Sequence, residues 1–196
     1  MLIAEDCFDL VDTNVKQALQ PALNAVSRQF NQCSTVIVAS EGLESFMECF
    51  RIIQGAEIWQ SLGSWIEQHN PHLGPGINER ITAARTVTTA EEKGARARHR
   101  EIRLHLDHLM QPGNILCLPT SPRVAPAKNT RTSTLEVTYR YQAICLLSIA
   151  GLGGLPEITL PLASLDGLPV GISLVGARGS DKQLLQLSRS IMEQVE

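Results

Sequence analysis

The sequence has no long hydrophobic run and few aromatic residues. Its longest apolar segments are short and interrupted, whereas a membrane-spanning helix needs about 20 mostly apolar residues, so we expect no membrane span. No positively charged segment followed by an apolar core opens the chain, and secretion is therefore not indicated. Aromatic residues make up only 4% of the chain and the net charge is −3. Both values argue against direct nucleic-acid binding.

Cysteines are few, odd in number and scattered, and no C-x-x-C pair occurs. This distribution argues against a disulfide framework or a zinc site, and it favours free, mostly buried thiols in a reducing compartment. We therefore expect a cytoplasmic protein. The five cysteines are Cys7, Cys33, Cys49, Cys117 and Cys145.

Familiar catalytic motifs are also missing. The sequence contains no G-x-S-x-G, no P-loop and no G-x-G-x-x-G after a predicted strand. Cys117 lies within a predicted buried strand without a partner histidine, which favours a structural cysteine over a nucleophile. On the residues alone, no self-contained active site emerges.

One predicted helix carries two histidines at a spacing that suits metal ligands. His105 and His108 lie three residues apart, but arginines crowd the same helix and would repel a cation. The same arginines could contact RNA, yet a solvent-exposed face paired with Asp and Glu is the commoner state of such residues. We therefore expect no metal and no nucleic acid at this helix.

What is present suits one globular α/β unit. The chain has 196 residues, 43% of them hydrophobic, and can bury a real core. Short apolar runs at 35–39 and 115–120 predict buried strands, and their alternation with helices predicts an α/β fold. No repeat or linker divides the chain, so residues 1–196 are expected to form a single unit. The predicted helices cover 12–30, capped by Asp12 and kinked at Pro21, then 43–69, 77–85, 89–109 with a capping box at Thr89 and Glu92, and 137–150.

The segment 157–187 is the most strongly patterned part of the chain. Two apolar strands flank Asp166 and Gly167, a pair typical of a tight hairpin turn. Pro161 interrupts the first strand and indicates a sheet edge or a strand end. In the second strand, alternate residues are large and apolar, which predicts one buried face. These residues are Val170, Ile172 and Leu174.

Taken in order, these segments resemble the C-terminal part of an amidase signature enzyme. "LPTSPRVAP" (118–126) resembles the family's strand that ends in Pro-Thr and is followed by a loop closing on Ala-Pro. "GLPEITLPLASLDGLPVGISLVGARGSDKQLLQL" (154–187) resembles its C-terminal signature, and Glu57, Trp65 and "GPGINERI" (74–81) follow the family order. The resemblance spans essentially the whole chain and is closest to stand-alone amidases of the indole-acetamide type. It implies a mixed β-sheet flanked by α-helices.

The resemblance implies a hydrolase that cleaves small carboxamides through an acyl-serine intermediate and needs no cofactor. Such enzymes use a Ser–Ser–Lys triad, whose serines lie in a Gly/Ser-rich segment downstream of the lysine. No lysine here precedes such a segment, so no catalytic residue is carried over, and we expect this chain to be truncated relative to the family and inactive alone. The lysines are Lys16, Lys93, Lys128 and Lys182.

The resemblance also places two connections near the substrate. It predicts Thr120, Gly154, Leu155 and Pro156 as substrate-binding wall residues, although Gly154 and Pro156 could simply end a helix and begin a strand. An alternative function is that of the glutaminase-type component of a glutamine-dependent tRNA amidotransferase, its A chain, and a non-enzyme alternative is a binding or scaffold module derived from an amidase. Exposed strand edges predict a homodimer or a larger assembly.

Overall fold

A five-stranded mixed sheet forms the centre of the protein in our computed structural model, which describes residues 1–74, 76–131 and 134–195. The strands are β1 (Leu2–Ala4), β2 (Ser34–Val36), β3 (Ile115–Pro119), β4 (Glu157–Leu165) and β5 (Leu168–Gly176). Their order in the sheet is β2-β1-β3-β5-β4. β1 is parallel to β2 and β3, whereas β5 is antiparallel to β3 and β4, so every strand except β5 points the same way. The predicted α/β fold with a mixed, helix-flanked sheet is confirmed.

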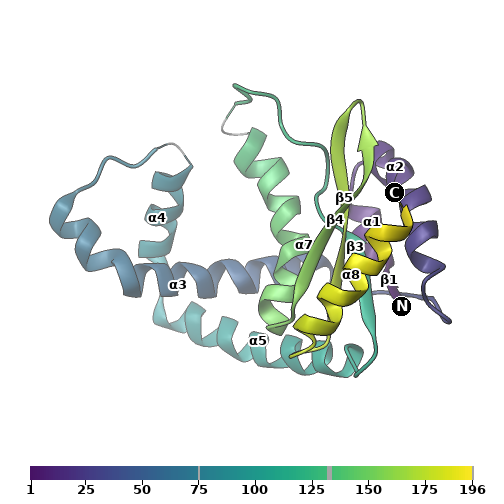
Figure 1. The fold of residues 1–196 in the computed structure, drawn as a ribbon. Helices are drawn as coiled ribbons and strands as arrows, with labels where there is room; N and C mark the ends of the chain where they lie inside the picture. The colour runs from purple at the N-terminus through teal and green to yellow at the C-terminus, as the bar shows by residue number, and fades with distance from the viewer. Residues whose placement is uncertain (75, 132–133, 196) are drawn as a thin grey trace.

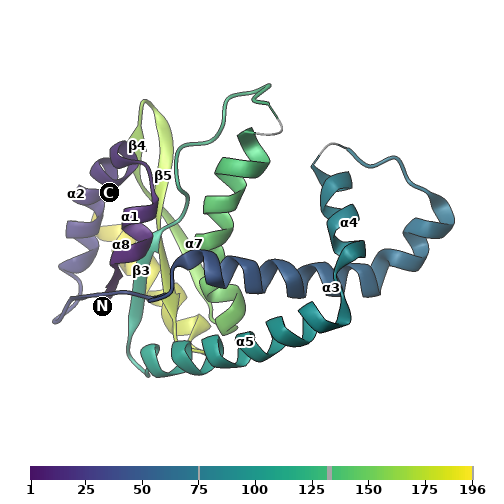
Figure 2. The same ribbon diagram turned by 180° about the vertical axis from the view of Figure 1, so that it is seen from behind.

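Helices surround the sheet and also extend away from it. They are α1 (Glu5–Leu10), α2 (Thr13–Ser27), α3 (Leu43–His69), α4 (Ile77–Thr86), α5 (Thr89–Leu109), the π-helical η1 (Leu135–Tyr139), α7 (Arg140–Gly153) and α8 (Asp181–Val195). Figures 1 and 2 show that α3, α4 and α5 form an arm, whereas α1, α2 and α8 lie beside the sheet. α7 stands between the sheet and the arm and packs against α3 and α5.

The C-terminal hairpin forms as its sequence predicts. Asp166 and Gly167 have φ values of 53° and 76°, the left-handed conformation that a two-residue turn of type I′ requires. The register of β4 against β5 shifts between Leu160 and Ala163, which accommodates Pro161 because proline cannot donate to the ladder. β4 is the last strand in the order, so the edge position that Pro161 indicated is confirmed.

Strand β5 is buried on both of its faces. Residues 170–176 are all buried, including Gly171 and Ser173 on the face opposite Ile172. β5 lies between β3 and β4, and α2 and α8 pack against β4 and β5. An interior strand covered in this way is apolar almost throughout. The alternation in the sequence therefore found the apolar face correctly but did not reveal that the other face is also covered.

The predicted strand over 35–39 is shorter than expected and lies at the sheet edge. β2 ends at Val36, and Ile37 is 50% exposed. The chain leaves the sheet there because Asp6 Oδ2 accepts hydrogen bonds from the backbone N–H groups of Val38 and Ala39, at 3.0 and 2.9 Å. A side chain from α1 thus replaces the neighbouring strand, and neither β1 nor α1 was expected from the sequence.

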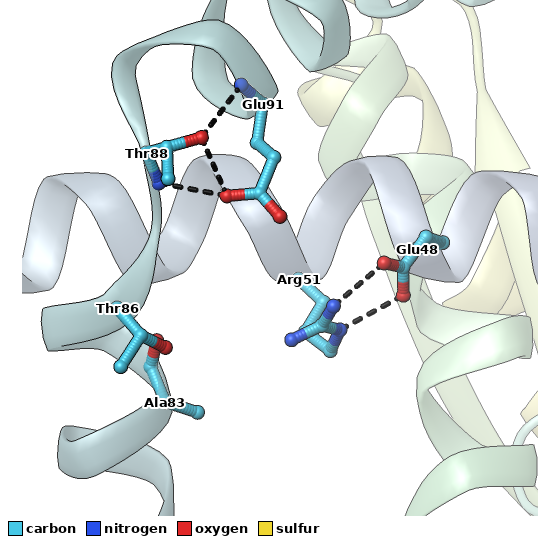
Figure 3. A network of polar contacts seen from close by, with 6 residues as sticks. All are labelled: Glu48, Arg51, Ala83, Thr86, Thr88 and Glu91. Atoms are coloured by element: carbon cyan, nitrogen blue, oxygen red, sulfur yellow. Dashed lines mark hydrogen bonds and ion pairs between the residues drawn. The ribbon is translucent and has the colours of Figure 1, made fainter.

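Two predicted helix caps need correction, whereas the helices themselves form. Asp12 precedes α2 but makes no capping hydrogen bond, because its carboxylate pairs with Arg123 instead. The capping box of α5 uses Thr88 and Glu91, one residue earlier than predicted, as Figure 3 shows. α2 runs through Pro21 as one helix.

Candidate functional site

The carboxyl ends of the parallel strands form one edge of the sheet, and Thr120 follows β3 at that edge. Ligands of open α/β sheets bind outside the carboxyl ends of the strands, where the connecting loops supply side chains. The Thr120 backbone N–H donates to the Gly171 carbonyl at 3.0 Å. This bond continues the β3–β5 ladder and fixes the start of the loop that leaves the sheet.

A cluster of hydroxyl groups lies on the sheet face beside Thr120. The Ser173 hydroxyl, fully buried on β5, is 3.0 Å from the Thr120 hydroxyl and 3.2 Å from that of Thr159. A Cβ at Gly171 would lie 3.1 Å from Thr120 Oγ1, so glycine leaves room for this contact. The cluster draws its members from three adjacent strands or their ends.

Glu157, at the start of β4, adds a carboxyl group to this cluster. Burial raises the pKa of Glu157, and its hydrogen bond with Ser173 partly opposes that rise. Glu157 Oε1 is buried and has no hydrogen-bond partner among the described residues. Burial of an unpartnered oxygen favours the neutral form of this acid. The sequence analysis missed Glu157 and Ser173, although a charged and a polar residue within otherwise apolar strands were available as a signal.

Arg123 ties the loop after Thr120 to α7. Its Nη2 donates to Gln142 Oε1 at 2.8 Å and lies 3.1 Å from Asp12 Oδ1. Gln142 Nε2 in turn donates to the Leu10 carbonyl at 3.2 Å. The first turn of α7 is therefore held close to the loop that carries Thr120.

A cavity of about 540 Å³ lies beside that same end of α7, between α3, α4 and α7. Ligand pockets commonly measure about 300–1,000 Å³ and are mostly apolar. In Figure 1, α4 and α7 rise from α3 on either side of the region that the cavity occupies. Apolar side chains that line it include Met47, Phe50, Ile58, Ile81, Val87 and Ile144.

Polar groups border this cavity in defined pairs. Arg51 donates to both carboxylate oxygens of Glu48, at 2.8 and 2.6 Å, as Figure 3 shows. This pair lowers the pKa of Glu48 and raises the pKa of Arg51, so both groups stay charged. Partial desolvation raises the pKa of Tyr141, with Cys145, Glu44 and Glu48 adding to the rise. The Tyr141 hydroxyl therefore remains a neutral donor at the cavity rim.

The four predicted wall residues lie at two different places. Thr120 lies near the first turn of α7, whereas Gly154 caps the other end of that helix in the left-handed conformation. The helix between them is about 20 Å long at 1.5 Å per residue. Leu155 is 9% exposed, and its N–H donates to the Ala150 carbonyl at 3.0 Å, while the Pro156 carbonyl accepts from Gly176 at 2.9 Å. Their wall role remains a prediction.

The candidate metal and thiol sites have structural surroundings. His105 Nε2 lies 2.9 Å from the Val38 carbonyl, and over the described ranges no three His, Cys, Asp or Glu side chains gather around a possible metal position. Cys117 is fully buried, and burial raises the pKa of its thiol to about 12. It is therefore a buried structural cysteine, as predicted. No helix within the part of the chain that the structure describes is long and apolar enough to cross a membrane.

A mixed α/β sheet with a polar cluster and a ligand-sized cavity near the carboxyl ends of its strands defines the class of α/β proteins that bind small ligands at that edge. Residues 13–185 match the sequence profile of the Amidase family. The chain therefore belongs to the amidase family, whose members are hydrolases.

Relatives and solved structures agree with this assignment. The chain is 31% identical to Amidase 1 of Arabidopsis thaliana over 222 residues, which cover 97% of this chain and 52% of that protein. It is 25% identical over 213 residues to the chloroplastic Outer envelope protein 64 of the same plant, covering 94% of this chain and 36% of that one. A solved amidase structure superposes with a TM-score of 0.82 at 22% identity, over 98% of this chain and 44% of that chain, which shows the shared fold.

The glutamyl-tRNA(Gln) amidotransferase of Chloroflexus aggregans contains a component, its A chain, that is similar over a shorter stretch. This component is 28% identical over 140 residues, which cover 68% of this chain and 28% of the component. The chain thus spans about half the length, or less, of the curated relatives it matches.

Proposed function

We propose that residues 1–196 form one unit of an amidase fold and supply the substrate wall of an enzyme that hydrolyses small carboxamides. The observation that carries this proposal is the family match over residues 13–185 in a chain that has no two adjacent serines. The serine nucleophile and its lysine base then belong to a segment that this sequence does not contain. In the reaction, the serine oxygen attacks the amide carbonyl, the C–N bond breaks, and the amine leaves with the serine proton. Water then hydrolyses the acyl-serine ester to release the acid.

The wall would contribute binding rather than chemistry. The cavity between α3, α4 and α7 offers an apolar surface for the acyl part of the amide, and Thr120 lies near its α7 side through the Arg123–Gln142 contact. Gly154, Leu155 and Pro156 are proposed as a second part of the wall, at the opposite end of α7. A wall of this kind contacts the substrate in the ground state and the transition state alike, so it acts mainly on KM.

A test of the proposal compares the 196-residue chain with a longer gene product that carries a serine-rich segment. Ammonia or amine release from small aryl and aliphatic amides is measured for both. We expect turnover by the longer protein and none by the 196-residue chain. Turnover by the 196-residue chain that survives repurification and a Cys117→Ala substitution would overturn the proposal. A longer protein that binds amides without turnover would favour the scaffold alternative.

The amidotransferase component is the second candidate, and the similarity to its Chloroflexus aggregans counterpart favours it. Amidase 1 is more similar over more of the chain, which is why hydrolysis of small amides ranks first. Glutamine discriminates between the two functions. Ammonia release from glutamine that depends on further protein components and charged tRNA supports the second candidate, whereas release from simple amides by one chain supports the first.

The compartment and the assembly belong to the same proposal. Four of the five cysteines are buried free thiols and only Cys33 is exposed, which supports a reducing cytoplasmic compartment. One relative is named an outer envelope protein, so cell fractionation is the deciding measurement. A small amide is the proposed ligand of the intact enzyme, and a homodimer is its proposed assembly.

A further inference from the structure

The cavity between α3, α4 and α7 is bordered by positive charge without negative charge of its own. Arg51, Arg80 and Arg140 line it, one from each of the three helices, and no aspartate or glutamate is among its lining residues. Three separate elements therefore bring guanidinium groups to a cavity whose remaining surface is largely apolar. This combination is unusual for a site that only accommodates hydrocarbon, because charged groups are normally kept away from such surfaces.

The three arginines differ in how far their charge is compensated. Arg51 is held by Glu48 through two hydrogen bonds, so its charge is balanced from outside the cavity. Arg80, on α4, is half-buried and forms no ion pair with any residue that the structure describes. Arg85, one turn further along α4, is by contrast 3.1 Å from Glu67 and stacks over Trp59 at 5.5 Å. Arg80 is therefore the arginine of α4 whose guanidinium can bind a ligand.

Arginine at an apolar cavity suits one class of ligand in particular. Its planar guanidinium binds a carboxylate through two parallel hydrogen bonds, and the low dielectric of a partly buried site strengthens that bond. The neutral Tyr141 hydroxyl at the rim is a further donor to an anionic group. Phe50, Ile81 and Ile144 provide an apolar surface beside these donors.

We propose that this cavity binds compounds with an apolar body and a terminal carboxylate, with Arg80 as the residue that selects the acid. The inference rests on the proposed amidase function and names its substrate class: amides whose acyl part ends in a free carboxylate. The carboxylate lies against Arg80, and the apolar body lies along α3 and α7. No covalent step takes place in the cavity, so Arg80 determines specificity and is not a catalytic residue.

The test is a binding measurement on the 196-residue chain with a matched pair of probes. Calorimetric titration with 4-phenylbutyrate and with the neutral 4-phenylbutyramide compares an acid and an amide of nearly the same shape. We expect the acid to bind about tenfold more tightly, a preference that falls as salt is added. Arg80→Gln should abolish the preference while leaving the affinity for the neutral probe unchanged, and Arg80→Lys should restore part of it. Circular dichroism confirms that each variant is folded.

Arg85→Gln is the matched control, since Arg85 lies on the same helix but does not line this cavity. It should leave the preference for the acid intact. Equal binding of both probes, failure of either probe to bind the folded chain, or a preference that survives Arg80→Gln would overturn the inference. Hydrolysis of neutral amides by the longer protein without any preference for acidic ones would overturn it while leaving the amidase proposal standing. A preference for the acid in a protein without amidase turnover would overturn the proposed function alone.

Discussion

The hydroxyl groups of Thr120 and Ser173 lie 3.0 Å apart, although 53 residues separate them in the sequence. Thr120 closes β3 and Ser173 lies in the middle of β5, so this bond joins the loop at the candidate site to the most buried strand of the sheet. Ser173 also lies 3.2 Å from the Thr159 hydroxyl and is fully buried. The position of the loop therefore depends on one serine that no solvent reaches.

Replacing that serine should destabilise the protein. Ser173→Ala removes the shared partner of Thr120 and Thr159 and leaves polar groups unsatisfied. We expect the free energy of unfolding to fall by about 1–3 kcal/mol. Urea denaturation measures it, with Ser164→Ala as control, because Ser164 is exposed on the same hairpin. Equal stability of the two variants would show that the cluster contributes nothing.

The buried carboxyl group of Glu157 should make stability depend on pH in a defined direction. Burial raises its pKa in the folded state above the unfolded value, so the neutral acid stabilises the fold at low pH, and this contribution is lost as pH rises through the folded pKa. Glu157→Gln, which is always neutral, should therefore raise Tm relative to the wild type at neutral pH. The advantage should shrink toward about pH 4, the range of an ordinary glutamate pKa.

Thermal melts across this pH range measure the effect of Glu157→Gln. Glu193→Gln provides the control, since Glu193 lies on the exposed side of α8 in an ion pair with Arg189. A Glu157→Gln variant that is less stable than the wild type at neutral pH would show that the ionised carboxylate stabilises the fold.

The 196-residue chain should self-associate. β2 and β4 end the described sheet on either side, and the exposed Ile37 (50%) and Leu168 (42%) lie next to these edges. Unpaired strand edges with apolar neighbours favour pairing with another chain. We expect dimers or larger species in analytical ultracentrifugation, and fewer of them in an Ile37→Lys variant, because a charge at the edge opposes pairing. A clean monomer at all concentrations would contradict this.

The Leu155→Ala variant separates a substrate wall from a structural turn. Leu155 is 9% exposed, and its side chain packs so closely on Gly153 that an added Cβ there would lie 2.7 Å from it. Truncation of such a leucine costs about 2–5 kcal/mol, so we expect Tm to fall. If Leu155 also contacts substrate, KM of the longer enzyme rises while kcat is unchanged. A lower Tm with unchanged KM would leave Thr120 as the wall residue.

Much of the fold follows from local pattern. Helical periodicity located α3 to its two terminal residues, and the Asp166–Gly167 pair located the hairpin, because both signals depend on residues a few positions apart. The short first strand and α1 escaped notice, since three residues carry no periodicity. The spaced motifs also identified the family, which the match over 13–185 confirms.

The sequence by itself determined the elements, the hairpin, the family and the lack of a Ser–Ser–Lys triad in this chain. Only the tertiary structure decided which residues meet. It placed Asp6 at the end of β2, buried Ser173 under Thr120, and separated Thr120 from Gly154 by the length of α7. It also brought Arg51, Arg80 and Arg140 to one cavity from three helices. The physical reason is that periodicity reports which face of an element is apolar, whereas neighbours far away in the chain decide what covers that face and which polar groups they bring with them.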